Sequence, residues 1–205
     1  MQLMTIIQFT ALFKATSMYG GEQWQILMGA STRILSFSLI PLFGLSQAFQ
    51  PAVGANYGAK LYDRLSNIIK SFYSGAIFIG LPFLLVLEIF PKEILGLFID
   101  DSTIVDIGII NFRIMFSTYV FAGFTMLAVT FYQALGKAKQ ALLVVLGRQI
   151  ILYIPLVFLL PTVNNLGIQG VWLAAATVEL VMGLISIISI NKTMDKIRKQ
   201  KSAES

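Results

Sequence analysis

Residues Pro41–Lys60, PLFGLSQAFQPAVGANYGAK, decide the fold class of this chain. The stretch begins inside an apolar run and ends in polar residues, and prolines, glycines and amides interrupt it throughout. Pro51 removes a backbone donor, so carbonyl groups here need partners from protein or water, because hydrocarbon offers none. The stretch therefore predicts the inner end of a membrane helix that does more than anchor the chain.

The composition extends this prediction to the whole chain. Of its 205 residues, 57% are hydrophobic and 12% are charged, whereas a soluble domain has roughly 25% charged residues. The chain has no cysteine and no histidine, which excludes disulfides, thiolate or imidazole metal sites and nucleophilic cysteine chemistry. The net charge of +5 is divided among short loops and a tail. Because no basic groove carries aromatic residues, nucleic acid is not an expected partner.

Uncharged runs of about 20 residues recur along the chain, and each is about long enough to cross a ~30 Å hydrocarbon core. They predict an all-α membrane protein with six transmembrane helices, at about 1–18, 25–52, 68–90, 104–135, 141–160 and 166–190. Transmembrane barrel strands are shorter, ~9–11 residues, and alternate in polarity. We expect a short amphipathic helix to lie in the interface over 92–104, and a basic tail to follow over 191–205. The first run is barely long enough to span and is not typical of a signal peptide, so we expect the chain to be truncated at its start.

The charged residues predict the orientation of these helices. If the helices alternate in direction, the loops 59–70 and 136–148 and the tail share one side of the membrane. Eleven of the 15 lysines and arginines lie on that side. By the positive-inside rule this side is cytoplasmic, so both termini are predicted to be cytoplasmic and the protein to be a multi-pass protein of the plasma membrane. Contact of the basic tail with anionic lipid is a secondary possibility.

Three separated blocks of sequence carry a resemblance to a known family. They are GLSQAFQPAVGANYGAKLYDR, which includes Gln50, Pro51, Gly54, Asn56 and Gly58; FYQALGKAKQ, which includes Gln133; and GIQGVWLAAATVELV. In this order and on these runs they resemble the second half of the multidrug and toxic compound extrusion (MATE) family. The resemblance implies the C-terminal six-helix lobe of a twelve-helix, two-lobed transporter, a repeat arrangement that secondary transporters use.

The resemblance also implies a function. Such transporters export amphipathic organic cations by alternating access, driven by a proton or sodium gradient, without a cofactor or covalent chemistry. Some members carry acidic residues for sodium in the first and fourth helices of this lobe. Here neither the run 1–18 nor the stretch 113–135 has one, and the fourth-helix position falls near Phe124. We therefore expect that type of sodium site to be missing, and we expect no resident metal.

Ionisable residues inside the runs are the first candidates for the pathway. Glu179 lies near the middle of the sixth run, where an ionised side chain costs roughly 2.5–3.5 kcal/mol on insertion scales. It is either a protonatable, cation-facing group or a neutral, hydrogen-bonded residue between helices. Arg33 must form a pair, snorkel or line water. Arg113 and Arg148 lie near the ends of their runs, and we expect both to reach the interface.

Polar uncharged residues are the second group of candidates. Gln8, Gln47 and Tyr119 are candidates for the substrate or ion pathway. The motif residues Gln50, Pro51, Gly54, Asn56, Gly58 and Gln133 are expected near the cytoplasmic ends of their helices. They either gate the inner mouth or satisfy carbonyl groups and bond neighbouring helices. Abundant phenylalanine and methionine suit a cavity for apolar cations, but they suit lipid-facing helices equally well.

Two alternatives to a multidrug exporter stay open at this point. A flippase of lipid-linked saccharides in the same superfamily would have more cationic residues facing its cavity. A membrane fragment that transports nothing is the second alternative, because one lobe encloses only half a cavity. For transport, a missing N-terminal lobe or a second copy of the chain would have to complete the structure, in addition to membrane lipid.

Overall fold

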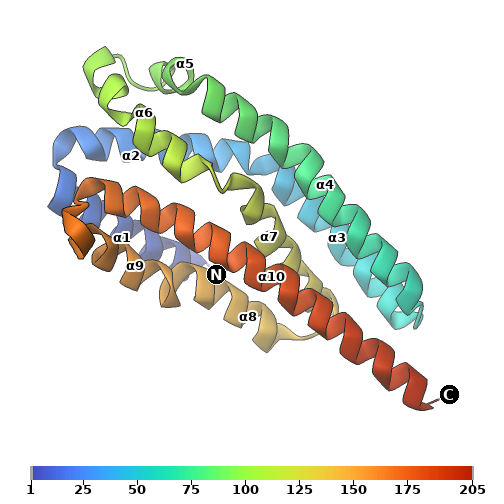
Figure 1. Ribbon diagram of the computed structural model, residues 1–205. Helices are drawn as coiled ribbons and strands as arrows, with labels where there is room; N and C mark the ends of the chain where they lie inside the picture. Colours follow the sequence, from blue (N-terminus) through green and yellow to red (C-terminus); the bar gives the residue numbers. More distant parts are fainter. Residues whose placement is uncertain (1, 205) are drawn as a thin grey trace.

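The structure, a computed structural model, describes residues 2–204, and regular helices account for most of them (Figure 1). The α-helices are α1 (Gln2–Gly20), α2 (Glu22–Ser38), α3 (Ile40–Gly58), α4 (Tyr62–Ile89), α5 (Pro91–Gly96), α6 (Ser102–Phe116), α7 (Tyr119–Ala134), α8 (Ala138–Leu146), α9 (Tyr153–Leu159) and α10 (Ile168–Glu204). A π-helical turn, η1 (Gly147–Ile151), joins α8 to α9, and a 3₁₀ segment, η2 (Leu160–Asn165), follows α9. The predicted all-α class is confirmed.

Four helical stretches are long and apolar enough to cross a membrane: Glu22–Gly58, Tyr62–Ile89, Ala138–Asn165 and Ile168–Lys199. The pair α6 and α7, bent by 40°, makes a fifth when it is counted as one span. The chain is thus a multi-pass membrane protein. The first predicted span coincides with α1, a helix of 19 residues, but α1 is not among these stretches, so its crossing stays a prediction.

The motif stretch is helical for longer than expected. We predicted a helix end near residue 52, but α3 continues through Pro51 to Gly58. It ends in a Schellman motif, because the amide of Leu61 donates to the carbonyl of Asn56 at 2.9 Å and Lys60 adopts a left-handed φ of 56°. The freed carbonyl groups at this helix end are therefore satisfied within the protein, as a membrane protein requires.

The fourth predicted run, 104–135, is not one straight helix. It breaks between α6 and α7 at Ser117 and Thr118, without a glycine or proline. The Ser117 hydroxyl donates to the carbonyl of Ile114 at 2.8 Å, and the Thr118 hydroxyl donates to the carbonyl of Ala176 on α10 at 3.1 Å. The Ser117 bond is local to α6, whereas the Thr118 bond ties the break to α10.

One other predicted boundary is wrong, and the predicted basic tail proves to be helical. The interfacial helix expected over 92–104 is only α5, because residues after Gly96 leave the helix and α6 begins at Ser102. The basic tail expected over 191–205 is instead a continuation of α10 to Glu204. It stays helical and packed because Ile190, Met194 and Ile197 repeat at helical spacing and are buried.

The lysine-rich ends of the helices lie together at one end of the bundle. In Figure 1 the α3–α4 turn, the α7–α8 turn and the C-terminal part of α10 all lie at the lower right. An ion pair supports this arrangement, because Arg198 on α10 approaches Asp63 at the start of α4 at 3.6 Å. The side of the membrane that this end faces stays a prediction.

Candidate functional site: a cavity with a buried ion pair

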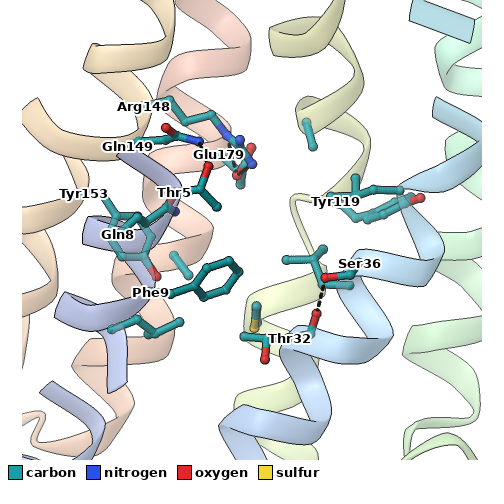
Figure 2. Close-up of a pocket in the computed structure, with 16 residues that line it drawn as sticks. Thr5, Gln8, Phe9, Thr32, Ser36, Tyr119, Arg148, Gln149, Tyr153 and Glu179 are labelled. Atoms are coloured by element: carbon teal, nitrogen blue, oxygen red, sulfur yellow. Dashed lines mark hydrogen bonds and ion pairs between the residues drawn. The ribbon is translucent and has the colours of Figure 1, made fainter. Parts of the chain in front are cut away.

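A cavity of about 230 Å³ lies within the bundle, between α1, η1, α9 and α10 on one side and α2 and α7 on the other. Figure 2 shows Thr5, Gln8, Phe9, Arg148, Gln149, Tyr153 and Glu179 gathered on the first side, and Thr32, Ser36 and Tyr119 across from them. Leucine and methionine side chains, among them Leu12, Leu35 and Met115, complete the wall. The site is thus an apolar chamber with a few convergent polar groups, the usual character of a small-molecule site.

An ion pair between Arg148 and Glu179 dominates the polar side. The Arg148 Nε donates to Glu179 Oε1 at 2.8 Å, and the Arg148 Nη2 donates to the same oxygen. The two side chains are only 21% and 18% exposed. Both bonds go to Oε1. The second oxygen, Oε2, is buried and has no hydrogen-bond partner among residues 2–204. A carboxylate with one unpartnered oxygen therefore lines the cavity.

Gln149 adds a second acceptor of this kind. Its Nε2 donates to the hydroxyl of Thr5 on α1 at 3.2 Å, which links η1 to α1. Its Oε1 is buried and, in the described part of the chain, has no hydrogen-bond partner. Gln149 and Glu179 thus each hold a buried acceptor oxygen without a partner in the described chain, beside the cavity that both residues line.

Backbone irregularities of three different spans meet at this cavity. Leu39, at the junction of α2 and α3, lines it, as does Tyr119, which begins α7 after the break in that span. Arg148 lies in η1, where the amide of Leu152 bonds the carbonyl of Gly147 in an i to i−5 pattern. The Tyr119 hydroxyl donates to the carbonyl of Ser38 at 2.5 Å and so ties two of these irregular points together.

The structure thus places three of the predicted pathway residues, Glu179, Gln8 and Tyr119, around one cavity. The other two lie elsewhere. Arg33 is exposed on α2 and lines two shallow depressions beside the cavity, and Gln47 is exposed on α3. Arg113 is also exposed, and its Nε donates to the carbonyl of Glu88 at 3.0 Å.

The motif residues lie outside the cavity. Gly54 on α3 approaches the carbonyl of Ala134 on α7, because a Cβ built at Gly54 would lie 3.9 Å from that oxygen. Asn56 donates to the carbonyl of Ala52 at 2.8 Å. The helix that carries Gln133 ends, like α3, in a Schellman motif, with Gly136 at a φ of 70°. The other motif residues, Gln50, Pro51, Gly58 and Gln133, lie near these two helix ends.

Comparison with known proteins identifies the family. The model of the MatE family matches residues 4–159, about three quarters of the chain. The chain belongs to the MatE family. The curated "Multidrug export protein MepA" of Staphylococcus saprophyticus is 21% identical to this MatE chain over 175 residues, which are 85% of the chain and 38% of that protein.

Solved structures of MatE-type transporters share the fold. The outward-facing conformation of a multidrug resistance MATE family transporter has a TM-score of 0.90 and 20% identity, over 97% of this chain and 44% of that one. A transporter from Pyrococcus furiosus Vc1, whose title reports a reverse polarity of the binding pocket, has a TM-score of 0.89 and 19% identity, over 96% of this chain and 44% of its own. This MatE chain spans less than half the length of these relatives, which is consistent with one lobe.

Arg148 is the residue of this MatE lobe that sequence reasoning placed wrongly. Hydropathy put it at the inner end of a run over 141–160, within reach of the interface. The span actually covers Ala138–Asn165, so Arg148 lies ten residues inside it, about 15 Å along the helix axis. Counting residues from the opposite end of the span would have placed Arg148 at a depth similar to that of Glu179. Arg148 is 13 residues from Pro161 and Glu179 is 11 residues from Ile168, so both lie about 17–20 Å from the same end.

Proposed function

We propose that this chain is the C-terminal lobe of a multidrug efflux antiporter of the plasma membrane, which exports amphipathic organic cations by alternating access. The free Oε2 of Glu179, buried at the cavity, is the observation that carries the proposal. A carboxylate at membrane depth is a functional candidate by default, because its insertion is costly unless it serves a purpose. Apolar walls with a convergent acid suit a compound that has an aromatic body and a cationic group.

Between a proton and sodium as the coupling ion, the geometry favours the proton. The guanidinium of Arg148 already occupies the position where a metal cation would approach Oε1, and its positive charge repels a second cation. No group of three or more acidic residues that could hold a metal ion exists among the residues that the structure describes. A proton needs only Oε2. Protonation of Glu179 would weaken the bond to Arg148 and so connect proton binding to the position of η1.

Alternating access requires points at which the spans can bend, and we infer that the irregular turns beside the cavity serve as these hinges. The π-helical turn in the fifth span and the 40° bend between α6 and α7 are irregularities of the kind found at functional sites and hinges. The C-terminal part of α3, which contains Pro51, and the lysine-bearing turn after it would brace the inner end of this span during the movement. Both termini would face the cytoplasm, in agreement with the grouped lysines.

The cavity favours the exporter over a saccharide flippase. A flippase would need several cationic residues to hold a diphosphate, but among the described residues Arg148 alone lines this cavity, where Glu179 neutralises it, and Arg33 is a single cation at the rim. The second alternative, a fragment that transports nothing, makes a different prediction: the chain would fold in the membrane without moving any compound.

The experiment is efflux of ethidium from cells or vesicles that contain this chain alone, or this chain together with an N-terminal MatE lobe. We expect efflux that needs a proton gradient, persists without sodium, and is lost in Glu179→Gln. Glu22→Gln is the matched control, because Glu22 is an exposed acid at the start of α2. Absence of gradient-dependent efflux in both settings would leave the inert fragment as the correct description. Efflux that requires sodium would overturn the assignment of the coupling ion.

A further inference from the structure

Arg33 is a charged residue at membrane depth that the proposed mechanism does not use. It lies 11 residues after Glu22, the first residue of α2, and this corresponds to about 17 Å along the helix axis. Glu179 lies equally far from the start of α10. Arg33 therefore lies inside the first half of the span Glu22–Gly58, where an arginine is costly unless it is paired or hydrated. Something other than lipid has to solvate it.

No acidic residue in the described part of the chain forms an ion pair with Arg33. On α1, α2 and α3 the sole acid is Glu22, three turns away, and Glu179 is committed to Arg148. Snorkelling does not solve the problem either. The start of the span, at Glu22, lies 11 residues away, about 17 Å along the axis, which is farther than an arginine side chain reaches.

The surroundings of Arg33 connect it to the cavity. Arg33 lines a depression of about 280 Å³ together with Phe9, Thr32, Ser36, Phe37 and Ile40. Three of these residues, Phe9, Thr32 and Ser36, also line the main cavity, so Arg33 lies at its rim. A second depression, of about 390 Å³, lies on the other side of Arg33. Arg33 is thus an exposed residue that shares a depression with Phe9 and Phe37 and adjoins the cavity that Glu179 lines.

We propose that Arg33 forms an anion subsite at the rim of the cavity, which binds the carboxylate, sulfonate or phosphate group of an amphipathic aromatic compound. The planar guanidinium pairs with such groups through two parallel bonds, and Phe9 and Phe37 supply contacts for the aromatic body. The inference rests on the proposed function in that it treats the cavity as the substrate path. It places the anionic group of such a compound at Arg33 and any cationic group on the Glu179 side of the cavity.

The test compares two fluorescent probes that share one aromatic body. Anilinonaphthalene sulfonate carries an anionic group, and phenylnaphthylamine lacks it. Binding of each probe is measured by fluorescence titration on the full chain in lipid nanodiscs, without any ion gradient. We expect Arg33→Gln to weaken binding of the sulfonate about tenfold and to change binding of the uncharged probe less than twofold. Arg33→Lys keeps the charge but loses the fork, so we expect an intermediate loss.

Two controls separate the subsite from general charge effects. Lys14→Gln removes an exposed cation of α1 that lines neither depression nor the cavity, and we expect it to leave both affinities unchanged. Unchanged sulfonate binding in Arg33→Gln would overturn the proposal. An equal loss of both probes would do so as well, because it would indicate a structural role. Since no gradient is used, this outcome is independent of the efflux assay, in which the proposed function can fail by itself.

Discussion

Removal of Glu179 tests whether the ion pair is a genuine part of the fold. Arg148 Nε lies 2.8 Å from Glu179 Oε1, and both side chains are about four-fifths buried. At an effective dielectric constant of 20, two charges at that distance attract each other by about 6 kcal/mol, before the cost of removing them from water is subtracted. That cost is several kcal/mol for each ion, so the net contribution of the intact pair is small.

Breaking the pair has a larger effect than its net contribution suggests. Glu179→Ala leaves Arg148 in a buried position without its counter-charge, and we expect the free energy of unfolding to fall by about 3 kcal/mol, the low end of the range for buried pairs. Arg148→Met leaves the acid unpaired and should cost a similar amount. The double variant Arg148→Met/Glu179→Leu removes both charges and keeps the volume, so it should come within about 1 kcal/mol of the wild type.

The assay is reversible unfolding of the full chain in detergent micelles, followed by the fluorescence of the buried Trp172. The two single variants and the double variant form a double-mutant cycle, from which the interaction energy is obtained. Arg33→Met is the matched control, because it removes an exposed arginine at similar depth, and we expect a change below about 1 kcal/mol. If the two single effects add to the double effect within about 0.5 kcal/mol, the pair has no coupling and the reasoning is refuted.

Three further predictions concern packing and the motif. A Cβ at Gly183 would lie 2.6 Å from the Cβ of Phe121, so Gly183→Ala should lower the free energy of unfolding by about 1–3 kcal/mol. Gly29 has open space around it, so Gly29→Ala is the control and should leave the free energy of unfolding unchanged. Tyr132→Phe removes a hydroxyl that bonds Ser189 at 2.5 Å and should cost about 0.6–1.7 kcal/mol, measured by the same unfolding assay. Pro51→Ala restores a backbone donor in α3 and should slow ethidium efflux at unchanged expression, and unchanged efflux would contradict a role in the inner gate.

Hydropathy and charge were sufficient to predict the helical class and the grouping of lysine-rich ends, because both follow from solvation by lipid. They were insufficient where side chains act on the backbone. Ser117 and Thr118 divide the fourth run, although neither a glycine nor a proline marks the break. Similarly, lysines after Ile190 suggested a tail, whereas Met194 and Ile197 continue the apolar face of α10.

The candidate site could be predicted only in part, since it depends on which helices pack together. Glu179 was identifiable because an acid in an apolar run is costly wherever it lies. Arg148 became identifiable only when the two spans were aligned from their shared end. The amides of the motif have a role that the sequence left open. Asn56 bonds the carbonyl of Ala52, which supports the structural interpretation for this residue.

The irregular backbone of this lobe gives an independent reason to regard the cavity as functional. Regular helices satisfy all their backbone groups in lipid, and a break at membrane depth is tolerated only where protein or a water-filled cavity surrounds it. Here the α2–α3 junction, the α6–α7 break and the π-helical turn η1 all contribute residues to one cavity, namely Leu39, Tyr119 and Arg148. The backbone irregularities of three spans therefore meet at the cavity that holds the Arg148–Glu179 pair, which supports the proposal that movement and ion binding are linked there.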